Sequence, residues 1–441
     1  MRVMKWSMIA LAVAAGTSQF AMASSQDESK GFLEDQSLKL KTRFEYMNRD
    51  FKNGYGNTTR ANGNKTTTNV PGDREAGYRQ DSGISQLLSY ESGFTQGTVG
   101  FGLDAMVMGA AKLDGGNGHA GNGLFATNGD GDPEDTQSRA GGAVKFRVSD
   151  TVLKYGNQFV ASPVFATDDS RLLPEIATGT LITSKEIKGL EVNLGRFTAL
   201  SSQTGMGRDS INGKGAKGLT SANIGGATYQ FTDNFVAGFA ASDIDNYFKK
   251  QYINANYTLP INDSQSLNFD FNGYRTKGDG QELAGAVDNK IWSLAAAYSI
   301  GAHKFTLAHQ RSSGDNGYYY GVDGNGTVFL ANSIQISDFV GKDERSWQAR
   351  YDLNMTSYGV PGLSFMTRFV KGDNISTSSN TEGKENEANF EAKYVLQEGP
   401  AKDLSLRVRY AVYRANGAYN ADYATDNNDL RFIAEYPLNI L

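Results

Sequence analysis

The feature that most constrains the fold of this chain is a strict alternation of apolar and polar residues in long segments. The first such segment sets Leu38, Leu40, Thr42, Phe44 and Tyr46 against Lys39, Lys41, Arg43 and Glu45. Successive side chains of a β-strand point to opposite faces, so this segment has one apolar and one polar face. The same alternation recurs, for example at 99–107, 267–272, 347–353 and 404–411. The pattern predicts strands that separate an apolar medium from water.

The alternating segments are longer than the strands of most globular proteins. They run to nine or more residues, whereas the mean strand has ~5–6 residues and a strand tilted across a bilayer needs ~9–11. A soluble sandwich, in which the apolar face is a packed core, is the alternative interpretation. The strand length favours a sheet that spans a membrane.

Eighteen strand-like segments can be identified, and the connections between them alternate between long and short. The long connections are predicted at 48–82, 110–139, 157–177, 198–218, 276–289, 312–344, 372–386 and 415–428, while 245–249 is short where a long one is expected. Long outer loops and short periplasmic turns are typical of outer-membrane barrels. In lipid, only closure of the sheet pairs every backbone group. We therefore predict an all-β fold, an eighteen-stranded antiparallel transmembrane β-barrel.

The first 23 residues have the pattern of a secretory signal peptide. Arg2 and Lys5 precede an apolar stretch from Met8 to Ala15. The small residues Ala21 and Ala23 stand at the two positions that a signal peptidase reads, so cleavage is expected after Ala23. We expect residues 24–441 to form a single barrel domain in the outer membrane of a Gram-negative cell. No linker or shift in composition indicates a second domain.

Composition and motifs exclude several other classes of protein. The chain has no Cys, which removes disulfide scaffolds and thiolate metal sites, and only three His. We found no phosphate loop or metal-ligand spacing, and the formal net charge of -5 argues against a nucleic-acid partner. We therefore expect no metal and no cofactor. Two alternatives to a channel stay open: a plugged structural or adhesive barrel, and an outer-membrane hydrolase, although no nucleophile elbow is present.

The inward face of the predicted barrel carries a basic stripe. About 16–18 strands leave an aqueous channel, and closure places the first and last strands side by side. The inward cations of neighbouring strands then share one part of the wall: Lys39, Lys41, Arg43, Arg431, Arg407, Arg409, Lys393, Arg368 and Arg350. A wall that carries charges of one sign raises the local concentration of ions of the opposite sign. Arg also binds carboxylates in bidentate geometry. The stripe predicts conduction of carboxylate-bearing solutes, unless Glu45, Glu391 and Glu435 neutralise it as structural ion pairs.

Two long connections are candidates for a constriction. The connection 157–177 contains Pro163 and Pro174 and places polar residues around Leu172 and Leu173, namely Asp168, Asp169, Ser170, Arg171 and Glu175. A stiff loop of this kind either folds into the lumen or lies exposed on the surface. The connection 312–344 carries Asp315 and Asp323. Opposite the basic stripe these acids would create a transverse field that selects zwitterions; otherwise they are ordinary loop acids.

Several longer phrases resemble the OprD-type specific porins of pseudomonads. They are TVLKYG at 151–156, DSRLLPE at 169–175, QYINANYTLP at 251–260, DNKIWSLAAAY at 288–298, GAHKFTLAHQRSSGD at 301–315 and YPLNIL at 436–441. The resemblance implies a monomeric eighteen-stranded channel, in contact with outer-membrane lipid and lipopolysaccharide. It also implies uptake of small carboxylate-containing solutes, with basic amino acids and small peptides first and other carboxylates next.

The resemblance also implies particular site residues. In the family the third and seventh outer loops constrict the lumen, here 157–177 and 312–344, and a basic ladder follows the wall. Matching strand phrases place that ladder at Arg43, Lys393, Arg407, Arg409 and Arg431, with Arg147 as a further member. An acid of the seventh loop faces the ladder in the family, and Asp323 is the match. One departure is Met366, which stands where Lys is expected, with Arg368 two residues later on the same face.

Overall fold

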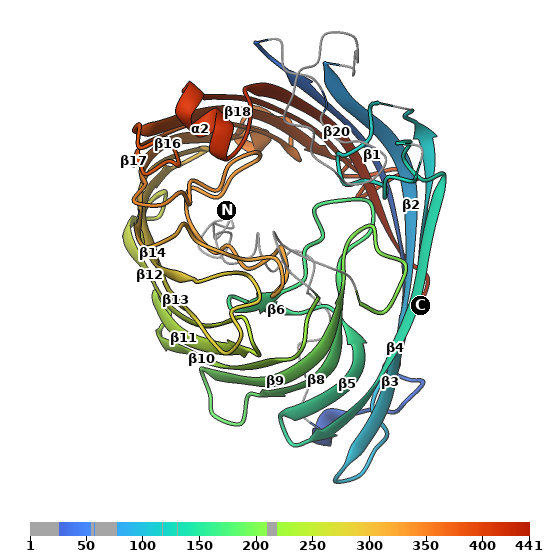
Figure 1. Cartoon of the computed structure of the whole chain (residues 1–441). Helices are drawn as coiled ribbons and strands as arrows, with labels where there is room; N and C mark the ends of the chain where they lie inside the picture. The colour runs from blue at the N-terminus through green and yellow to red at the C-terminus, as the bar shows by residue number, and fades with distance from the viewer. Residues whose placement is uncertain (1–25, 54–56, 58–76, 117, 130, 210–217) are drawn as a thin grey trace.

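The computed structural model (Figure 1) describes residues 26–53, 57, 77–116, 118–129, 131–209 and 218–441. Within these residues, eighteen strands form one antiparallel sheet. Its first strand, β1 (Ser37–Phe51), pairs with β2 (Tyr78–Glu91) on one side and with the last strand, β20 (Asn427–Asn439), on the other. The sheet is therefore closed, which confirms the predicted barrel. The expected signal peptide, 1–23, lies outside the described residues.

The remaining strands follow one another around the barrel in chain order. They are β3 (Gly100–Asp114), β4 (Thr136–Val148), β5 (Thr151–Gln158), β8 (Ile176–Ser184), β9 (Leu190–Ser201), β10 (Ala222–Thr232), β11 (Phe235–Ile244), β12 (Phe248–Asn262), β13 (Gln265–Gly278), β14 (Asp288–Ile300), β15 (His303–Gly314), β16 (Arg345–Asn354), β17 (Leu363–Ile375), β18 (Gly383–Val395) and β19 (Ser405–Ala415). Two short strands, β6 (Ala161–Ser162) and β7 (Phe165–Ala166), form a hairpin between β5 and β8. The helical turns are η1 (Gln26–Glu28), η2 (Met355–Tyr358) and α2 (Gly417–Asp422).

In the part of the chain that the structure describes, no helix has both the length and the apolar character needed to cross a membrane.

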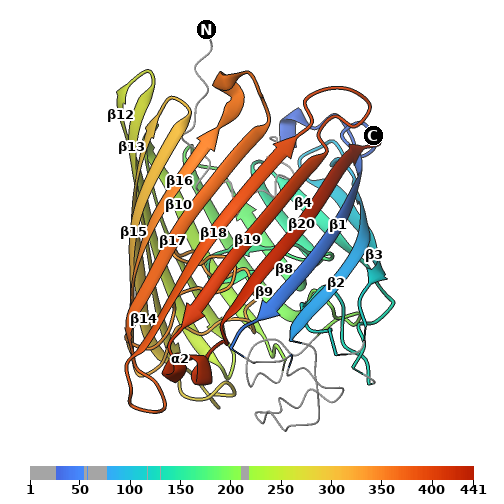
Figure 2. The ribbon, with the colours of Figure 1, turned by 90° about the horizontal axis from the view of Figure 1, so that it is seen from above.

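The connections segregate by length to the two ends of the barrel (Figure 2). Short turns such as 149–150, 233–234 and 301–302 lie at one end. The other end carries the outer loops, among them the third (159–175) and the seventh (315–344). The fifth outer loop, 245–247 between β11 and β12, is short, as the sequence predicted. Most of the observed loops are slightly shorter than the predicted ones, because strand pairing continues beyond the last apolar residue, as in the pair Gln158↔Ala177.

The outer face of the barrel is a band of exposed apolar side chains. Leu294, Leu307 and Phe369 expose 43%, 57% and 48% of their surface, while their neighbours in sequence point inward. Trp292 and Trp347 flank this band toward the long-loop end, on either side of His309. A continuous exposed apolar band with aromatic residues at its edge is what a bilayer requires of a transmembrane barrel.

The interior differs from the uniformly water-lined wall that the alternation suggested. In the long-loop half, side chains of the third and seventh loops pack against the inward faces of β8 to β14, including Phe165, Tyr318, Tyr252, Tyr274 and Ile291. Phe165 stacks on Phe197 with ring centroids 4.6 Å apart. A pattern of period two cannot predict this packing, because the partners of these inward residues lie on loops far away in sequence.

A second apolar cluster fixes the end of the third loop. Leu172 and Leu173 are buried against Met47 of β1, Leu87 of β2 and Met108 of β3. The two clusters attach the loop to opposite arcs of the wall, so it crosses the lumen, as Figure 1 shows for the segment around β6. The third loop folds into the barrel and is not exposed on its surface.

The assignment of faces can be tested with two adjacent residues of β14. Leu294→Arg places a charge against lipid and should lower the free energy of unfolding by ~2–4 kcal/mol. Ala295→Arg places the same charge on the inner wall, opposite Asp270, and should cost less than half as much. Denaturant unfolding in lipid vesicles measures both values. Equal losses would contradict the assigned faces.

Candidate channel constriction

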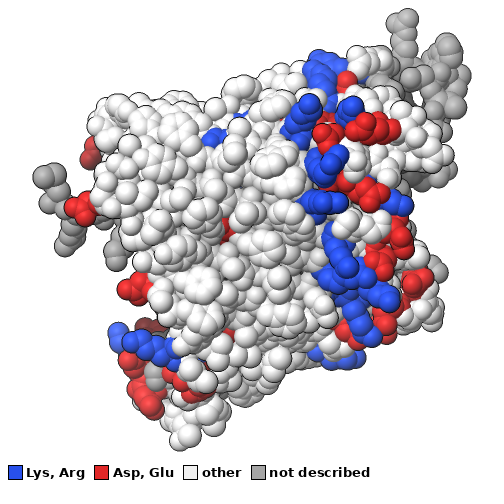
Figure 3. Space-filling view, turned by 90° about the vertical axis from the view of Figure 1, so that its left-hand side faces the viewer, with Lys and Arg blue, Asp and Glu red and all other residues white. Residues whose placement is uncertain are grey.

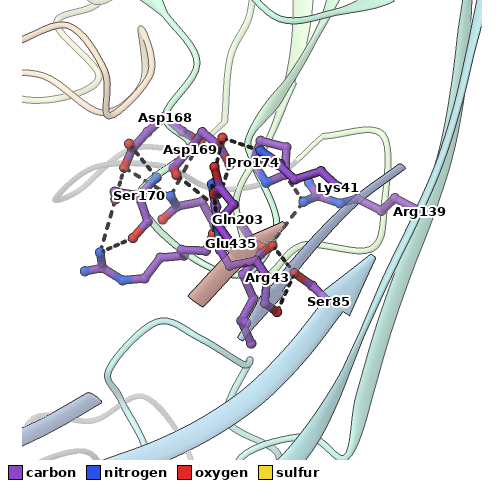
Figure 4. Close-up of polar contacts among 12 residues, drawn as sticks. Lys41, Arg43, Ser85, Arg139, Asp168, Asp169, Ser170, Pro174, Gln203 and Glu435 are labelled. Carbon is purple, nitrogen blue, oxygen red and sulfur yellow. Dashed lines mark hydrogen bonds and ion pairs between the residues drawn. The ribbon is translucent and has the colours of Figure 1, made fainter. Parts of the chain in front are cut away.

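The third loop is tied to the basic wall by Asp169 (Figure 4). Its carboxylate lies 2.7 Å from Lys41 Nζ and 2.8 Å from Arg43 Nη1, both on β1. Arg43 also pairs with Glu435 of β20 at 2.6 Å and donates to the carbonyl oxygen of Arg171. Burial alone would raise the pKa of Asp169, but Arg43 and Lys41 outweigh it and hold that pKa below its ordinary value. Arg43 thus holds the loop in the lumen.

Arg139 of β4 also holds the C-terminal part of the third loop, and the sequence analysis missed it. Its guanidinium donates to the carbonyl oxygen of Pro174 at 2.6 Å (Figure 4). It also donates to the carbonyl oxygen of Ser202 at 2.6 Å. The side chain is buried. Backbone carbonyl oxygens are available at every residue, so this role leaves no signal in the sequence.

The third and seventh loops are joined to each other. The buried carboxylate of Glu175 accepts hydrogen bonds from the backbone N–H and the side-chain amide of Asn325, at 3.0 and 2.5 Å. The N–H of Ala166 donates to the carbonyl oxygen of Asp323 at 3.1 Å. Gly324 has a φ of +94°, and a Cβ there would lie 1.9 Å from the Ala166 carbonyl oxygen. The two loops therefore form one partition.

Asp323 does not face the ladder, and the prediction that it does is wrong. Its carboxylate and the Lys250 ammonium of β12 lie 2.5 Å apart, and both side chains are 0% exposed. Lys250 also lies over the rings of Tyr318 and Phe248, 4.5 and 5.1 Å from their centroids. The pair anchors the seventh loop to the wall. Nothing in the sequence connects a loop acid to a strand cation 73 residues away.

Asp315 is also placed away from the constriction. It is exposed at the start of the seventh loop, where its N–H donates to the Asp288 carbonyl oxygen at 2.9 Å. The acids that meet inside the lumen are Asp168 of the third loop and Asp338 of the seventh loop. Asp338 accepts hydrogen bonds from the Tyr320 and Ser333 hydroxyls. Burial raises the pKa of Asp338, and the nearby Asp168 carboxylate raises it further.

The predicted ladder residues of β18, β19 and β20 lie side by side on one wall. Arg409 and Arg431 are directly paired across β19 and β20. Arg431 binds Asp429 at 2.7 Å and donates to the Gln335 carbonyl oxygen of the seventh loop at 3.3 Å. Glu391 pairs with Arg407 at 2.7 Å and with Arg409 at 3.4 Å. One carboxylate thus pairs with two guanidinium groups, so the positive charge of this wall is only partly neutralised.

Arg368 and Lys393 continue the wall toward the short-turn end. Arg368 Nε donates to Asn389 at 2.6 Å. Neither cation has an acidic partner within 4 Å among the residues described. Lys393 lines a hollow of about 340 Å³ in the inner wall together with Lys304, Arg350 and Met366.

Two further loop residues complete the site. Ser170 is exposed, and its hydroxyl donates to Asp168 at 2.7 Å. Arg171 Nε donates to the Asn122 carbonyl oxygen at 3.1 Å. Burial and the neighbouring charge of Arg431 lower the pKa of Arg171. The third loop therefore adds a cation of its own beside the ladder.

Arg147 is not part of the ladder, and its predicted membership is wrong. It lies on β4 beside the turn 149–150, buried to 3% exposure, at the short-turn end. Its Nε donates to Gln26 at 2.8 Å, and its guanidinium lies over the Phe94 ring at 4.2 Å. It secures the segment that precedes β1. The alternation identified its face correctly but could not show that Gln26, which precedes β1, covers it.

The arrangement forms an electrostatic constriction. A cationic wall lines the lumen together with a partition of two loops that carries Asp168 and Asp338, and Arg171 of the third loop lies near both Asp168 and Arg431. In the part of the chain described, no group of three or more His, Asp or Glu side chains could hold a metal ion. The described residues of this site act on a solute through electrostatic attraction and steric fit.

The closed fold with inward-folded loops defines a channel-forming β-barrel of the outer membrane. Comparison with known proteins gives the particular family. The model of the outer membrane porin, OprD family, matches residues 30–440. Porin D of Pseudomonas aeruginosa is 46% identical over 100% of both chains, and the porin-like protein GalP of Pseudomonas putida is 31% identical over 96% of this chain and 97% of its own.

Solved structures agree with the sequence comparison. OccAB1 of Acinetobacter baumannii superposes with a TM-score of 0.86 at 35% identity, covering 95% of this chain and 100% of that one. OprD of Pseudomonas aeruginosa superposes with a TM-score of 0.78 at 42% identity, covering 96% and 100%. The chain belongs to the OprD family of substrate-specific outer-membrane porins.

Removing one charge of the buried pair should release the seventh loop. Asp323→Asn leaves the Lys250 ammonium buried without its counter-ion, a change that typically costs ~3–5 kcal/mol. We expect higher and noisier single-channel conductance in planar bilayers. Asp315→Asn is the matched control, because it removes a loop carboxylate that is exposed. If both variants conduct like the wild type, Asp323 does not anchor the loop.

The burial of Glu175 between the two loops should become less favourable as the pH rises to about 8. Burial raises the pKa of Glu175 to about 8, against an ordinary value of 4.5. The unfolded carboxyl loses its proton above that ordinary value while the native one keeps it, so stability falls as the pH rises toward about 8, by at most ~1.4 kcal/mol per pH unit.

Single-channel current noise should therefore increase between about pH 5 and about pH 8 and change little above that. In Glu175→Gln the group no longer titrates, and the increase should disappear. A pH response that survives this substitution would assign it to another group.

Proposed function

We propose that this porin takes up small carboxylate-containing solutes along its basic wall, with basic amino acids and small peptides first and other carboxylates next. The observation that carries the proposal is the convergence of Arg409, Arg431 and Arg368 on one wall, with Asp168 and Asp338 on the loops that fold into the same lumen. A solute with a carboxylate and an ammonium group can satisfy both sides at once.

The proposal has a physical basis in charge and water exclusion. A low-dielectric wall of one sign raises the local concentration of the opposite ion. Arg presents a planar fork that fits a carboxylate. Glu391 is shared between two guanidinium groups, so an incoming carboxylate can replace it at one of them without leaving a cation unpaired.

A relative supports the class of solute. A structure of Pseudomonas aeruginosa OpdK was solved with vanillate, and it superposes on this chain with a TM-score of 0.81 at 30% identity, covering 93% of this chain and 100% of that one. Vanillate carries one carboxylate. We further propose that the exported protein is residues 24–441 and that each chain forms its own channel.

The basic wall is tested by liposome swelling with amino acids and with a neutral sugar of similar size. Arg409→Ala and Arg368→Ala should each lower the uptake of carboxylates about fivefold, because loss of one wall cation removes about 1 kcal/mol of attraction. Neutral-sugar uptake should stay unchanged. Arg196→Ala, an exposed Arg of β9 that binds Asn223, is the control for charge loss on the outer face.

Unchanged carboxylate uptake in both wall variants would defeat the proposal. Single-channel conductance of the wild type separates it from a plugged barrel, which would pass no current.

A further inference from the structure

A belt of cations lies on the outer face of the barrel at the long-loop end. Figure 3 shows Lys, Arg, Asp and Glu side chains gathered in a band along one edge of the side formed by β11 to β17. The basic belt, as we name it, comprises Lys249, Lys277, Lys290, Arg311, Arg345 and Lys371, all exposed. The ladder residues lie on the opposite, inner face, so the channel does not use these cations.

The strand register brings like charges together in this belt. Lys249 of β12 is directly opposite Lys277 of β13, and Arg311 of β15 is directly opposite Arg345 of β16. Cations facing each other across neighbouring strands repel and destabilise the sheet. An anion bound between them would remove this cost.

Neighbouring acidic side chains neutralise only part of the positive charge of the belt. Lys249 pairs with Asp279 at 3.0 Å, and Arg345 lies 3.6 Å from Asp373. Among the described residues, Lys277, Lys290, Arg311 and Lys371 have no acidic partner within 4 Å. Asp288, which is directly opposite Lys277, pairs with Arg275. The belt therefore keeps free cations.

The aromatic residues fix the depth of the belt in the membrane. Trp292 is directly opposite Arg311, and Trp347 is directly opposite Lys371. Such aromatic residues mark the interface at which lipid headgroups lie, at the edge of the apolar band. The belt cations thus lie at the headgroup level of the outer leaflet, above the apolar surface of Leu307 and Phe369.

A hollow lies beside the belt. It has a volume of about 410 Å³ and is lined by Arg311, Ser313, Ser376, Thr377 and Glu382, among others. Lys290 is directly opposite Ser313. Arg311 and the neighbouring Lys290 suit a phosphate, whereas the hydroxyl groups and the carboxylates of Asp343 and Glu382 in the lining suit the hydroxyl groups of a sugar.

We propose that the basic belt binds the phosphorylated sugar headgroup of lipopolysaccharide. The phosphates lie on Arg311, Lys290 and their neighbours, the sugar hydroxyls reach the hollow, and the acyl chains cover the apolar band below. This site is separate from solute uptake, so it stands or falls independently of the proposed substrates.

The test is binding of purified rough lipopolysaccharide to the full barrel in detergent, measured by native mass spectrometry. Lys290→Gln combined with Arg311→Gln should weaken binding about tenfold or more, since each surface cation contributes to attraction of anionic headgroups. Lys277→Gln combined with Lys371→Gln is a second variant in case the first fails to fold. Lys188→Gln combined with Lys402→Gln removes two exposed cations from the short turns and should bind like the wild type.

Three further arms identify the source of the anion. Dephosphorylated lipopolysaccharide and phosphatidylglycerol should bind more weakly than the phosphorylated glycolipid, and inorganic phosphate should not displace it. Carboxylate uptake should be unchanged in the belt variants. Equal binding by the belt variants and the wild type would overturn the proposal, as would displacement by inorganic phosphate or equal binding of phosphatidylglycerol.

Discussion

Closure of the sheet between β1 and β20 is the constraint on which the rest of this structure depends. In lipid an unpaired backbone group costs several kcal/mol, so the strands must form a ring without edges. The ring brings cations from the two ends of the chain together, Arg43 from β1 and Arg431 from β20, which are otherwise remote in sequence. It also separates two environments: the outer face meets lipid, and the inner face meets water or the loops.

The loops are held in the lumen by two different interactions. On the β1 side, ion pairs make the main contact, because the Asp169 carboxylate pairs with both Lys41 and Arg43. On the β12 side, a buried ion pair between Lys250 and Asp323 is surrounded by aromatic rings. Apolar packing of Phe165 and Leu173 supports both attachments. The constriction is therefore built from cations that serve as structural anchors as well as from cations that remain available to a solute.

The inner wall therefore contains both kinds of cation that the sequence suggested: some form structural ion pairs, and others stay available to a solute. Arg43 is occupied by the third loop and by Glu435, whereas Arg368 and Lys393 have no acidic partner among the described residues. Between these extremes, Arg407 and Arg409 share Glu391. The wall thus has a fixed part that shapes the constriction and a part whose charge is available to a passing anion. On the outer face, the aromatic residues Trp292 and Trp347 separate the apolar band from a second set of cations.

The alternation of residues by itself determined the fold, because a two-residue period over nine or more residues and segregated loop lengths leave few alternatives to a closed barrel. It also placed Arg409 and Arg431 on the inner face, because alternate residues of a strand share a face, and on neighbouring strands, because β19 and β20 follow each other in sequence. It could not place Asp323, Arg139 or Arg147. Their partners are Lys250, backbone carbonyl oxygens and Gln26, and these contacts depend on how loops and termini fold back in three dimensions. Periodicity reports which face a side chain occupies, whereas only the tertiary structure decides what it meets there.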